Sequence, residues 1–223
     1  MFWATRPPST AVLESIHELE NLMAILLIRH GETELNRARV VQPKDTPLSA
    51  KGIEQVQALA ERLTERPIER ILSSDLQRAQ MTAQAVAARF DLPITSNPLL
   101  RERDFGSLCG TPYSELTFDL FGEDYVPPEG ESWSQFRVRA AAAFELVVQH
   151  VADLSGDLAV VTHGLMCHTL IAGHAALAKD MELPSYWYNA GLTMLVPQAP
   201  HSVLLLNCAA HLGYPAAQGV SGL

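Results

Sequence analysis

The stretch AILLIRHGETELN, residues 24–36, decides the fold. Its first five residues form an apolar run that predicts a short strand. Arg29, His30 and Gly31 follow this run at once. Ligands of α/β sheets bind at the carboxyl ends of the strands, so this stretch predicts functional side chains directly after the first strand.

Outward from this stretch, strand-like and helix-like segments alternate along the chain. Further apolar runs predict strands at residues 70–73, 158–162, 192–196 and 203–206. Helical spacing predicts helices at residues 49–65, 75–90, 132–152 and 165–177. Asp75 is the expected N-cap of the second of these helices, and the remaining segments are expected to be loops. The alternation indicates a layered α/β domain with a largely parallel sheet, in which the last two strands form an antiparallel edge.

Three of the predicted strands lead into residues suited to binding an anion. Arg29 and His30 follow the first strand, and His163 follows the strand at 158–162. Arg78 lies one turn into the helix that follows the strand at 70–73. We therefore expect two imidazoles and two guanidiniums to meet at one rim of the sheet.

The length of 223 residues favours a single domain, because domains usually span about 100–200 residues. Residues 9–22 have helical spacing and precede Met23, which would make a plausible start for the core. We therefore divide the chain into an N-terminal helical extension (1–22), a core domain (23–212) and a C-terminal tail (213–223).

Composition excludes several classes of protein. A hydrophobic fraction of 48% with 18% charged residues does not fit a disordered chain. The net charge of −9 argues against a nucleic-acid-binding surface, which needs a basic patch. The uncharged stretch at residues 158–178 contains three histidines, so we read it as a strand, a turn and a helix rather than a membrane span.

The three cysteines, Cys109, Cys167 and Cys208, are widely spaced and match no zinc motif. They indicate a reducing, cytoplasmic setting. The beginning of the chain has no long apolar core and is not expected to be a secretory signal.

Six motifs carry a resemblance to a known family. In chain order they read LLIRHGETELN, DTPLSAKGIEQ, ILSSDLQRAQMTA, LLRERDFG, PPEGESW and VVTHG. Together they resemble the histidine phosphatase superfamily, the phosphoglycerate-mutase-like group, over about residues 23–208. The resemblance implies a three-layer α/β/α sandwich of the phosphoglycerate-mutase-like type, and no cofactor.

The resemblance also implies roles for individual residues. His30 matches the nucleophile that takes the phosphoryl group, and Glu102 matches the proton donor to the leaving oxygen. His163 is the third implied catalytic residue. The implied phosphate-binding residues are Arg29, Asn36, Gln42, Arg78 and Gly164.

General chemistry is consistent with these roles. Phosphoryl transfer depends mainly on positioning and on stabilising charge, which Arg29 and Arg78 can supply without a metal. A neutral imidazole is a competent nucleophile, and a leaving alkoxide needs a proton. A phosphate dianion beside Glu102 would raise the pKa of that carboxyl toward the range of a general acid.

Other residues near the motifs are expected to be structural. Gln42 is followed by Pro43 where many relatives have glycine, and proline has no N–H to offer a phosphate. Asp104 is expected to shape its loop and is the second choice for the acid, while Glu131 is expected at a helix start. Cys109 is placed near the pocket mouth without activation of its thiol. Structural roles are also expected for the remaining histidines considered, which are His17, His168 and His174.

Three functions remain open on the sequence. The first is a metal-independent phosphomonoesterase acting on a small-molecule phosphate ester, as a monomer or homodimer. The second is a cofactor-dependent phosphoglycerate mutase, and the third is an inactive phosphate-binding scaffold. The sequence retains His30, Glu102 and the expected phosphate clamp, which consists of Arg29, Arg78 and His163, and this argues against the scaffold. The lack of Lys or Arg between Arg103 and Arg137 favours hydrolysis. That acidic, aromatic-rich segment also predicts a preference for neutral or aromatic monophosphates.

Overall fold

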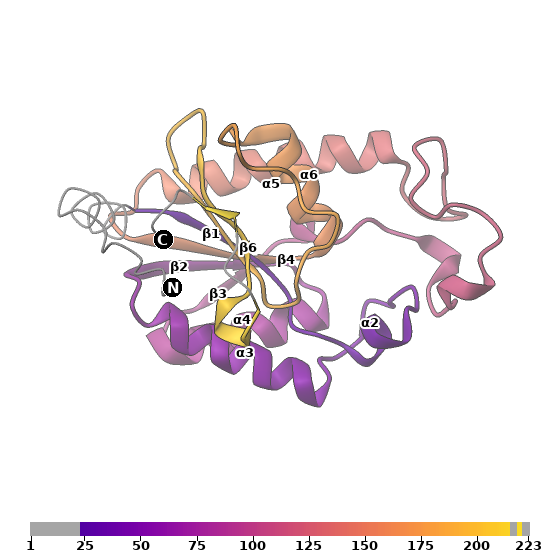
Figure 1. Ribbon diagram of the computed structural model, residues 1–223, viewed down its shortest axis with the longest axis horizontal. Coiled ribbons are helices and arrows are strands. Elements are labelled where there is room, and N and C mark those ends of the chain that lie inside the picture. The colour runs from indigo at the N-terminus through magenta and orange to yellow at the C-terminus, as the bar shows by residue number, and fades with distance from the viewer. Residues whose placement is uncertain (1–22, 215–217, 220–223) are drawn as a thin grey trace, which may run out of the picture.

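The computed structural model describes residues 23–214 and 218–219, and a seven-stranded sheet forms its centre (Figure 1). The strands lie in the order β3-β2-β4-β1-β5-β6-β7. Their bounds are β1 Ile25–Arg29, β2 Ile68–Ser73, β3 Ile94–Ser96, β4 Asp157–Thr162, β5 Leu192–Leu195, β6 Val203–Cys208 and β7 Gln218–Gly219.

The direction of the strands confirms the predicted sheet. β1 and β2 both pair with β4 in parallel, and β2 pairs with β3 in parallel. β5 pairs antiparallel with β1 on one side and with β6 on the other, and β7 adds to β6 antiparallel. The sheet is therefore mostly parallel with an antiparallel edge.

Helices cover both faces of this sheet, as Figure 1 shows. The helices are α2 Glu34–Ala38, α3 Ala50–Leu63, α4 Gln77–Phe90, α5 Trp133–Val151 and α6 Gly164–His174. Alternate residues of β1 point to opposite faces: Leu26 and Ile28 pack in the cluster with α3 and α4, whereas Ile25 and Leu27 pack in the cluster with α5 and α6. This alternation produces the three layers.

The structure differs from the sequence prediction in several local details. The predicted loop after β1 contains α2, and the predicted loop at 92–130 contains β3 and three turns of 3-10 helix. The prediction of Asp75 as an N-cap is wrong: α4 begins at Gln77 after Leu76, whose side chain makes no capping bond. Asp75 instead accepts a 2.6 Å hydrogen bond from Arg101, an ion pair that competes with the capping geometry.

The described residues include only part of the two ends of the chain. The helix predicted at residues 9–22 lies outside the described residues. Within the segment expected to be a tail, Gln218 and Gly219 form β7, in which Gly219 pairs with Leu205 of β6. Within residues 23–214 and 218–219, none of the helices has the length and apolar character that crossing a membrane needs.

The register of the parallel strands brings the predicted site together. Arg29 at the end of β1 is paired with Thr162 at the end of β4, and Ser73 at the end of β2 is paired with Val161. The residues that follow these strands therefore leave the sheet at the same edge.

A glycine on each side allows the loop after β1 to lie against α3. A Cβ on Gly52 would stand 2.0 Å from the carbonyl oxygen of Glu32. A Cβ on Gly31 would stand 2.7 Å from Val56. Neither position can accept a side chain without moving backbone, so both glycines allow the loop that carries His30 to pack closely against α3.

Candidate active site

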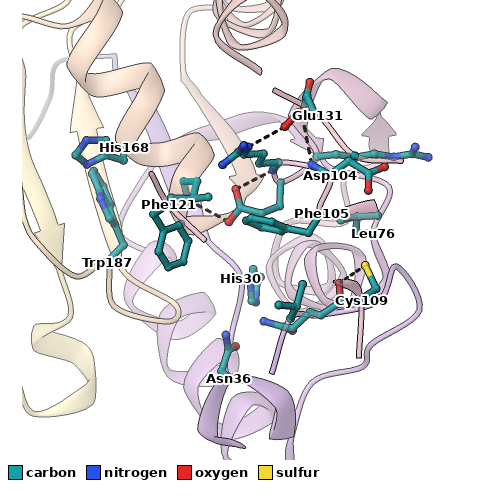
Figure 2. A pocket seen from close by; sticks show the side chains of 18 of the residues that line it. His30, Asn36, Leu76, Asp104, Phe105, Cys109, Phe121, Glu131, His168 and Trp187 are labelled. Carbon is teal, nitrogen blue, oxygen red and sulfur yellow. Dashed lines mark hydrogen bonds between the residues drawn. The ribbon is translucent and has the colours of Figure 1, made fainter. Parts of the chain in front are cut away.

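A cavity of about 1180 Å³ opens at the carboxyl edge of the parallel strands. Figure 2 shows it from close by, with His30 at the centre of the view, Asn36 below it and the rings of Phe105 and Phe121 above. Of the predicted site residues, the following line it: Arg29, His30, Asn36, Gln42, Arg78, Glu102 and Gly164. His163 is not among the lining residues, but its ring lies next to that of His30, with 5.1 Å between the ring centroids.

His30 is held as a neutral imidazole with one nitrogen free. The side chain is 2% exposed, and its Nδ1 lies 2.7 Å from the carbonyl oxygen of Gly31. A carbonyl can only accept, so Nδ1 carries the proton and Nε2 keeps its lone pair. Burial, followed by the charges of Arg78 and Arg29, lowers the pKa of His30 well below 6.5. The imidazole is therefore ready to act as a nucleophile at neutral pH.

His163 is the second buried imidazole. Its Nε2 shares a 2.9 Å hydrogen bond with Ser74 Oγ, while its Nδ1 is buried and has no hydrogen-bond partner. Burial and the charge of Arg78 lower the pKa of His163 well below 6.5. Ser74 therefore orients this ring, and Nδ1 remains a buried nitrogen without a partner.

Arg29 and Arg78 place two guanidiniums beside the imidazoles. Arg29 donates to the carbonyl of Trp187, and Arg78 donates to the carbonyl of Pro43 at 3.1 Å. The Nε atoms of both arginines are buried without a partner. Burial lowers the pKa of Arg78 to about 10, so its side chain stays cationic at neutral pH. Buried donors of this kind are usually satisfied, and an anionic ligand would satisfy these.

Asn36 and Gln42 close the loop beside the cavity. Asn36 Oδ1 accepts from Asn189 Nδ2 at 3.2 Å and from the backbone N–H of Thr33 at 3.1 Å. Gln42 Oε1 accepts from Thr33 Oγ1 at 2.8 Å. These contacts use the oxygen of each amide and leave the NH₂ groups for a ligand. Pro43 offers no N–H, as its chemistry requires, but its carbonyl positions the guanidinium of Arg78.

Gly164 begins α6 directly after His163. A Cβ at this position would stand 3.4 Å from Nε of Arg29, which is ordinary van der Waals contact. Gly164 therefore lies against the clamp, but space alone does not require glycine here.

Glu102 is bound to the start of α6. Its two carboxylate oxygens accept from the backbone N–H groups of Leu165 at 3.0 Å and Met166 at 3.1 Å. The same carboxylate contributes to the electrostatic surroundings of Arg78 and Tyr113. The side chain thus lies at the start of α6, within electrostatic reach of Arg78.

Arg139 and Glu131 fix the backbone that carries Glu102. Arg139 donates to the carbonyls of Leu99 and Arg101, both at 2.8 Å, and to that of Glu102 at 3.1 Å. Glu131 pairs with Arg139 at 2.7 Å, and both side chains are largely buried. Glu131 is therefore a structural partner of the site rather than merely a residue at the start of a helix.

Residues 104–136, which we call the lid, form one wall of the cavity. The guanidinium of Arg103 donates to the carbonyls of Glu131 at 2.9 Å and Tyr125 at 2.6 Å, and it lies 4.3 Å from the ring centroid of Trp133. These contacts join the lid to the loop of Glu102. The lid contributes aromatic and acidic side chains to the cavity: Asp104, Phe105, Tyr113, Phe121, Glu123, Glu129, Glu131 and Trp133.

Sequence reasoning missed several residues that line the cavity or support His30 and His163. His168, expected to be structural, lines the cavity together with Trp187 (Figure 2). Asn189 is bonded to the backbone carbonyl of His30 at 3.1 Å. Ser74 stands in the motif directly after β2 and was the one missed residue with a signal, since a hydroxyl at a strand end can orient a neighbouring ring. His168 lies on α6, whereas Trp187 and Asn189 are brought in by the chain after α6, which carries no motif.

Cys109 lies at the mouth of the cavity, as expected. Its thiol is 3.7 Å from the carbonyl oxygen of Gln42. Burial and the charge of Asp104 raise the pKa of Cys109 above 9.0, so the thiolate is disfavoured. The residue is therefore not an activated nucleophile.

The lowered pKa of His30 predicts the pH dependence of catalysis. Only the neutral imidazole can attack, so activity is lost as the pH falls through the pKa of the folded protein, well below 6.5. We expect the acidic limb of kcat/KM to lie below pH 6.5 once the ionisation of the substrate phosphate, near about pH 6, is divided out. An enzyme limb at or above pH 6.5 would contradict the assignment of a neutral His30.

Fold and site together define a class. Buried neutral imidazoles, unpartnered guanidinium nitrogens and a carboxylate meet at the carboxyl edge of a mostly parallel α/β sheet, which is the arrangement of an enzyme that handles phosphoryl groups. The family model of the histidine phosphatase superfamily (branch 1) matches residues 25–208. The chain belongs to this superfamily.

Named relatives are both mutases and phosphatases. "Probable phosphoglycerate mutase GpmB" of Enterobacter sp. (strain 638) is 38% identical over 161 residues, which are 68% of this chain and 74% of that protein. A mycobacterial glucosyl-3-phosphoglycerate phosphatase, solved with VO3, is 30% identical with a TM-score of 0.64, covering 78% of this chain and 92% of that one. A phosphoserine phosphatase of Entamoeba histolytica, solved with phosphoserine, is 26% identical with a TM-score of 0.68, covering 86% and 100%.

Proposed function

We propose that this protein is a metal-independent phosphomonoesterase that works through a phosphohistidine at His30. The observation that carries the proposal is the state of His30: neutral, with Nε2 free, and within the electrostatic reach of Arg29 and Arg78. An inactive scaffold would have no need to keep a nucleophile in this state.

The reaction has two steps. In the first, the lone pair of His30 Nε2 forms a bond to phosphorus while the ester P–O bond breaks, and the leaving oxygen takes a proton from Glu102. In the second, Glu102 takes a proton from water, the resulting hydroxide forms a P–O bond, and the P–N bond breaks to release phosphate. Arg29, Arg78 and His163 stabilise the charge of the phosphoryl oxygens in both steps.

A phosphoglycerate mutase is the second candidate, because curated relatives carry that name. Mutase-like members of the family carry cations in the segment after the Glu loop, whereas the lid of this protein contains no Lys or Arg, which supports hydrolysis. We expect incubation with 3-phosphoglycerate and catalytic 2,3-bisphosphoglycerate to release inorganic phosphate faster than it forms 2-phosphoglycerate. Faster formation of the isomer would make the protein a mutase.

Catalysis is expected to need no divalent ion. Among the described residues, no three His, Cys, Asp or Glu side chains are grouped so as to hold a metal. Dialysis against a chelator should leave turnover unchanged, and vanadate should inhibit because it adopts the geometry of the transferred phosphoryl group. Loss of turnover that magnesium or zinc restores would refute the metal-free mechanism.

We further propose that the protein acts in the cytoplasm on a small-molecule phosphate ester, as a monomer or homodimer, without nucleic-acid or membrane partners. Free thiols at Cys109, Cys167 and Cys208 support a reducing compartment. Sedimentation of the purified protein would determine the oligomeric state.

A further inference from the structure

The cavity is lined by more cationic side chains than the two that are proposed to bind the phosphoryl group of the substrate. Arg29 and Arg78 belong to the clamp. The other cationic residues that line the cavity are Arg39, Lys44, Arg101, Arg103 and Arg139. The expected preference for neutral esters considered only the lid, whereas Arg39 and Lys44 enter the cavity from the loop that follows α2.

Most of these cations already have partners. Arg101 is paired with Asp75, Arg139 with Glu131, and Arg103 with the lid carbonyls described above. Lys44 lies 3.7 Å from Asp104, a loose pair in which both side chains are about half exposed. Arg39 forms no ion pair with any carboxylate within the part of the chain that the structure describes.

Arg39 is instead held against the ring of Tyr113. The carbon at the centre of its guanidinium lies 5.8 Å from the ring centroid. The backbone fixes this contact: the N–H of Tyr113 donates to the carbonyl of Arg39 at 2.8 Å, and the N–H of Val41 donates to that of Thr111 at 3.0 Å. An antiparallel bridge between Val40 and Pro112 of the lid completes a short pairing of the two segments.

This pairing lies close to the reacting groups. Arg39 is the C-cap of α2, and its N–H donates to the carbonyl of Asn36 at 3.2 Å. The charges of Glu102, Arg29 and Arg39 all act on the pKa of Tyr113. Burial, the largest cause, together with Glu102 raises the pKa of Tyr113, so its hydroxyl keeps its proton and can donate a hydrogen bond.

We propose that Arg39 and the hydroxyl of Tyr113 form a second anion-binding subsite, which selects phosphomonoesters whose leaving group carries a further negative charge, such as a carboxylate or a second phosphate. A guanidinium and a phenol that share one wall match the oxygens of such a group. This inference rests on the proposed function, because the leaving group lies in the subsite only when the phosphoryl group lies at His30.

Acidic side chains limit the size of the effect. Glu102 is bonded to backbone amides and Asp104 lies beside Lys44, so neither faces the subsite unpaired. Glu129, which is exposed, also lines the cavity. Their combined charge opposes the binding of an anion, and we therefore expect a selectivity of about tenfold rather than thousands.

The test compares two esters that differ by one charge, phenyl phosphate and 4-carboxyphenyl phosphate. Arg39→Gln should lower kcat/KM for the carboxylated ester about tenfold, mainly through KM, and the loss on phenyl phosphate should be at least fivefold smaller. Arg37→Gln is the matched control, since Arg37 lies two residues earlier in α2, pairs with Glu34 and does not line the cavity. It should change neither ester, and Arg39→Lys should recover part of the selectivity.

Equal losses on the two esters, or no loss on either, would overturn the subsite. Binding of both esters to His30→Ala protein, with and without Arg39→Gln, should show the same tenfold change in Kd for the carboxylated ester alone. This second measurement needs no turnover. If the unmodified enzyme hydrolyses neither ester, the proposed function fails, while the Kd ratio still decides the role of Arg39.

Discussion

His30→Ala should lower kcat on any phosphomonoester by a factor on the order of 10⁴ or more, because the covalent route depends on Nε2. The clamp should survive, since Arg29 and Arg78 are fixed by the carbonyls of Trp187 and Pro43 and not by the imidazole. We therefore expect the variant to bind orthophosphate with an affinity close to that of the unmodified protein. Steady-state kinetics and equilibrium binding on one preparation test both statements.

Two results would count against this assignment. A loss smaller than about tenfold would mean that another group attacks phosphorus. Loss of phosphate binding together with a lower melting temperature would mean that the substitution disrupted the loop after β1, and a His30→Asn variant would then have to separate the two effects.

Glu102→Gln should lower turnover of alkyl phosphates by about 10²-fold or more, because the amide cannot supply the proton that an alkoxide needs. Turnover of aryl phosphates should fall much less, since phenolate leaves without full protonation. The comparison matters because Glu102 also accepts from two amides of α6, and glutamine can accept only with its single oxygen. If the substitution only shifts the position of side chains, turnover of both ester types falls alike. If Glu102 is the acid, turnover of alkyl phosphates falls much more than that of aryl phosphates.

Asp104 is the competing carboxylate in the same loop. Its Oδ1 accepts from the N–H of Gly106 at 2.9 Å, which is a loop-shaping contact. Asp104→Asn should therefore lower turnover of alkyl and aryl phosphates by similar factors, and by less than Glu102→Gln lowers turnover of alkyl phosphates. Equal losses on both types for Glu102→Gln, with a large alkyl-specific loss for Asp104→Asn, would move the acid role to Asp104.

Much of the fold was predictable because local pattern and tertiary environment agree. The apolar run at β1 is buried on both faces, and Ser49 caps α3 as its position suggests. The prediction of Asp75 as an N-cap failed because Arg101, which lies 26 residues away, takes its carboxylate. α2 was missed because only five residues are helical, too few for a periodic signal.

The site was predictable where its residues follow strands and less so where loops supply them. Arg29, His30 and His163 are placed by the register of the sheet, which the alternation of elements implies. Arg39 reaches the cavity, and Asn189 reaches the backbone of His30, through loop contacts that depend on the whole fold. The charge of the cavity wall could not be predicted from the lid alone, because the segment that carries Arg39 and joins the lid comes from about 70 residues earlier in the chain.

The most direct test of the account is to identify the residue that carries phosphate during turnover. Rapid quench with a labelled ester, followed by digestion and mass spectrometry, should give an acid-labile, base-stable phosphoryl group on His30, and His30→Ala should give none. An adduct that persists in His30→Ala, or one that forms on a serine, would contradict the phosphohistidine mechanism.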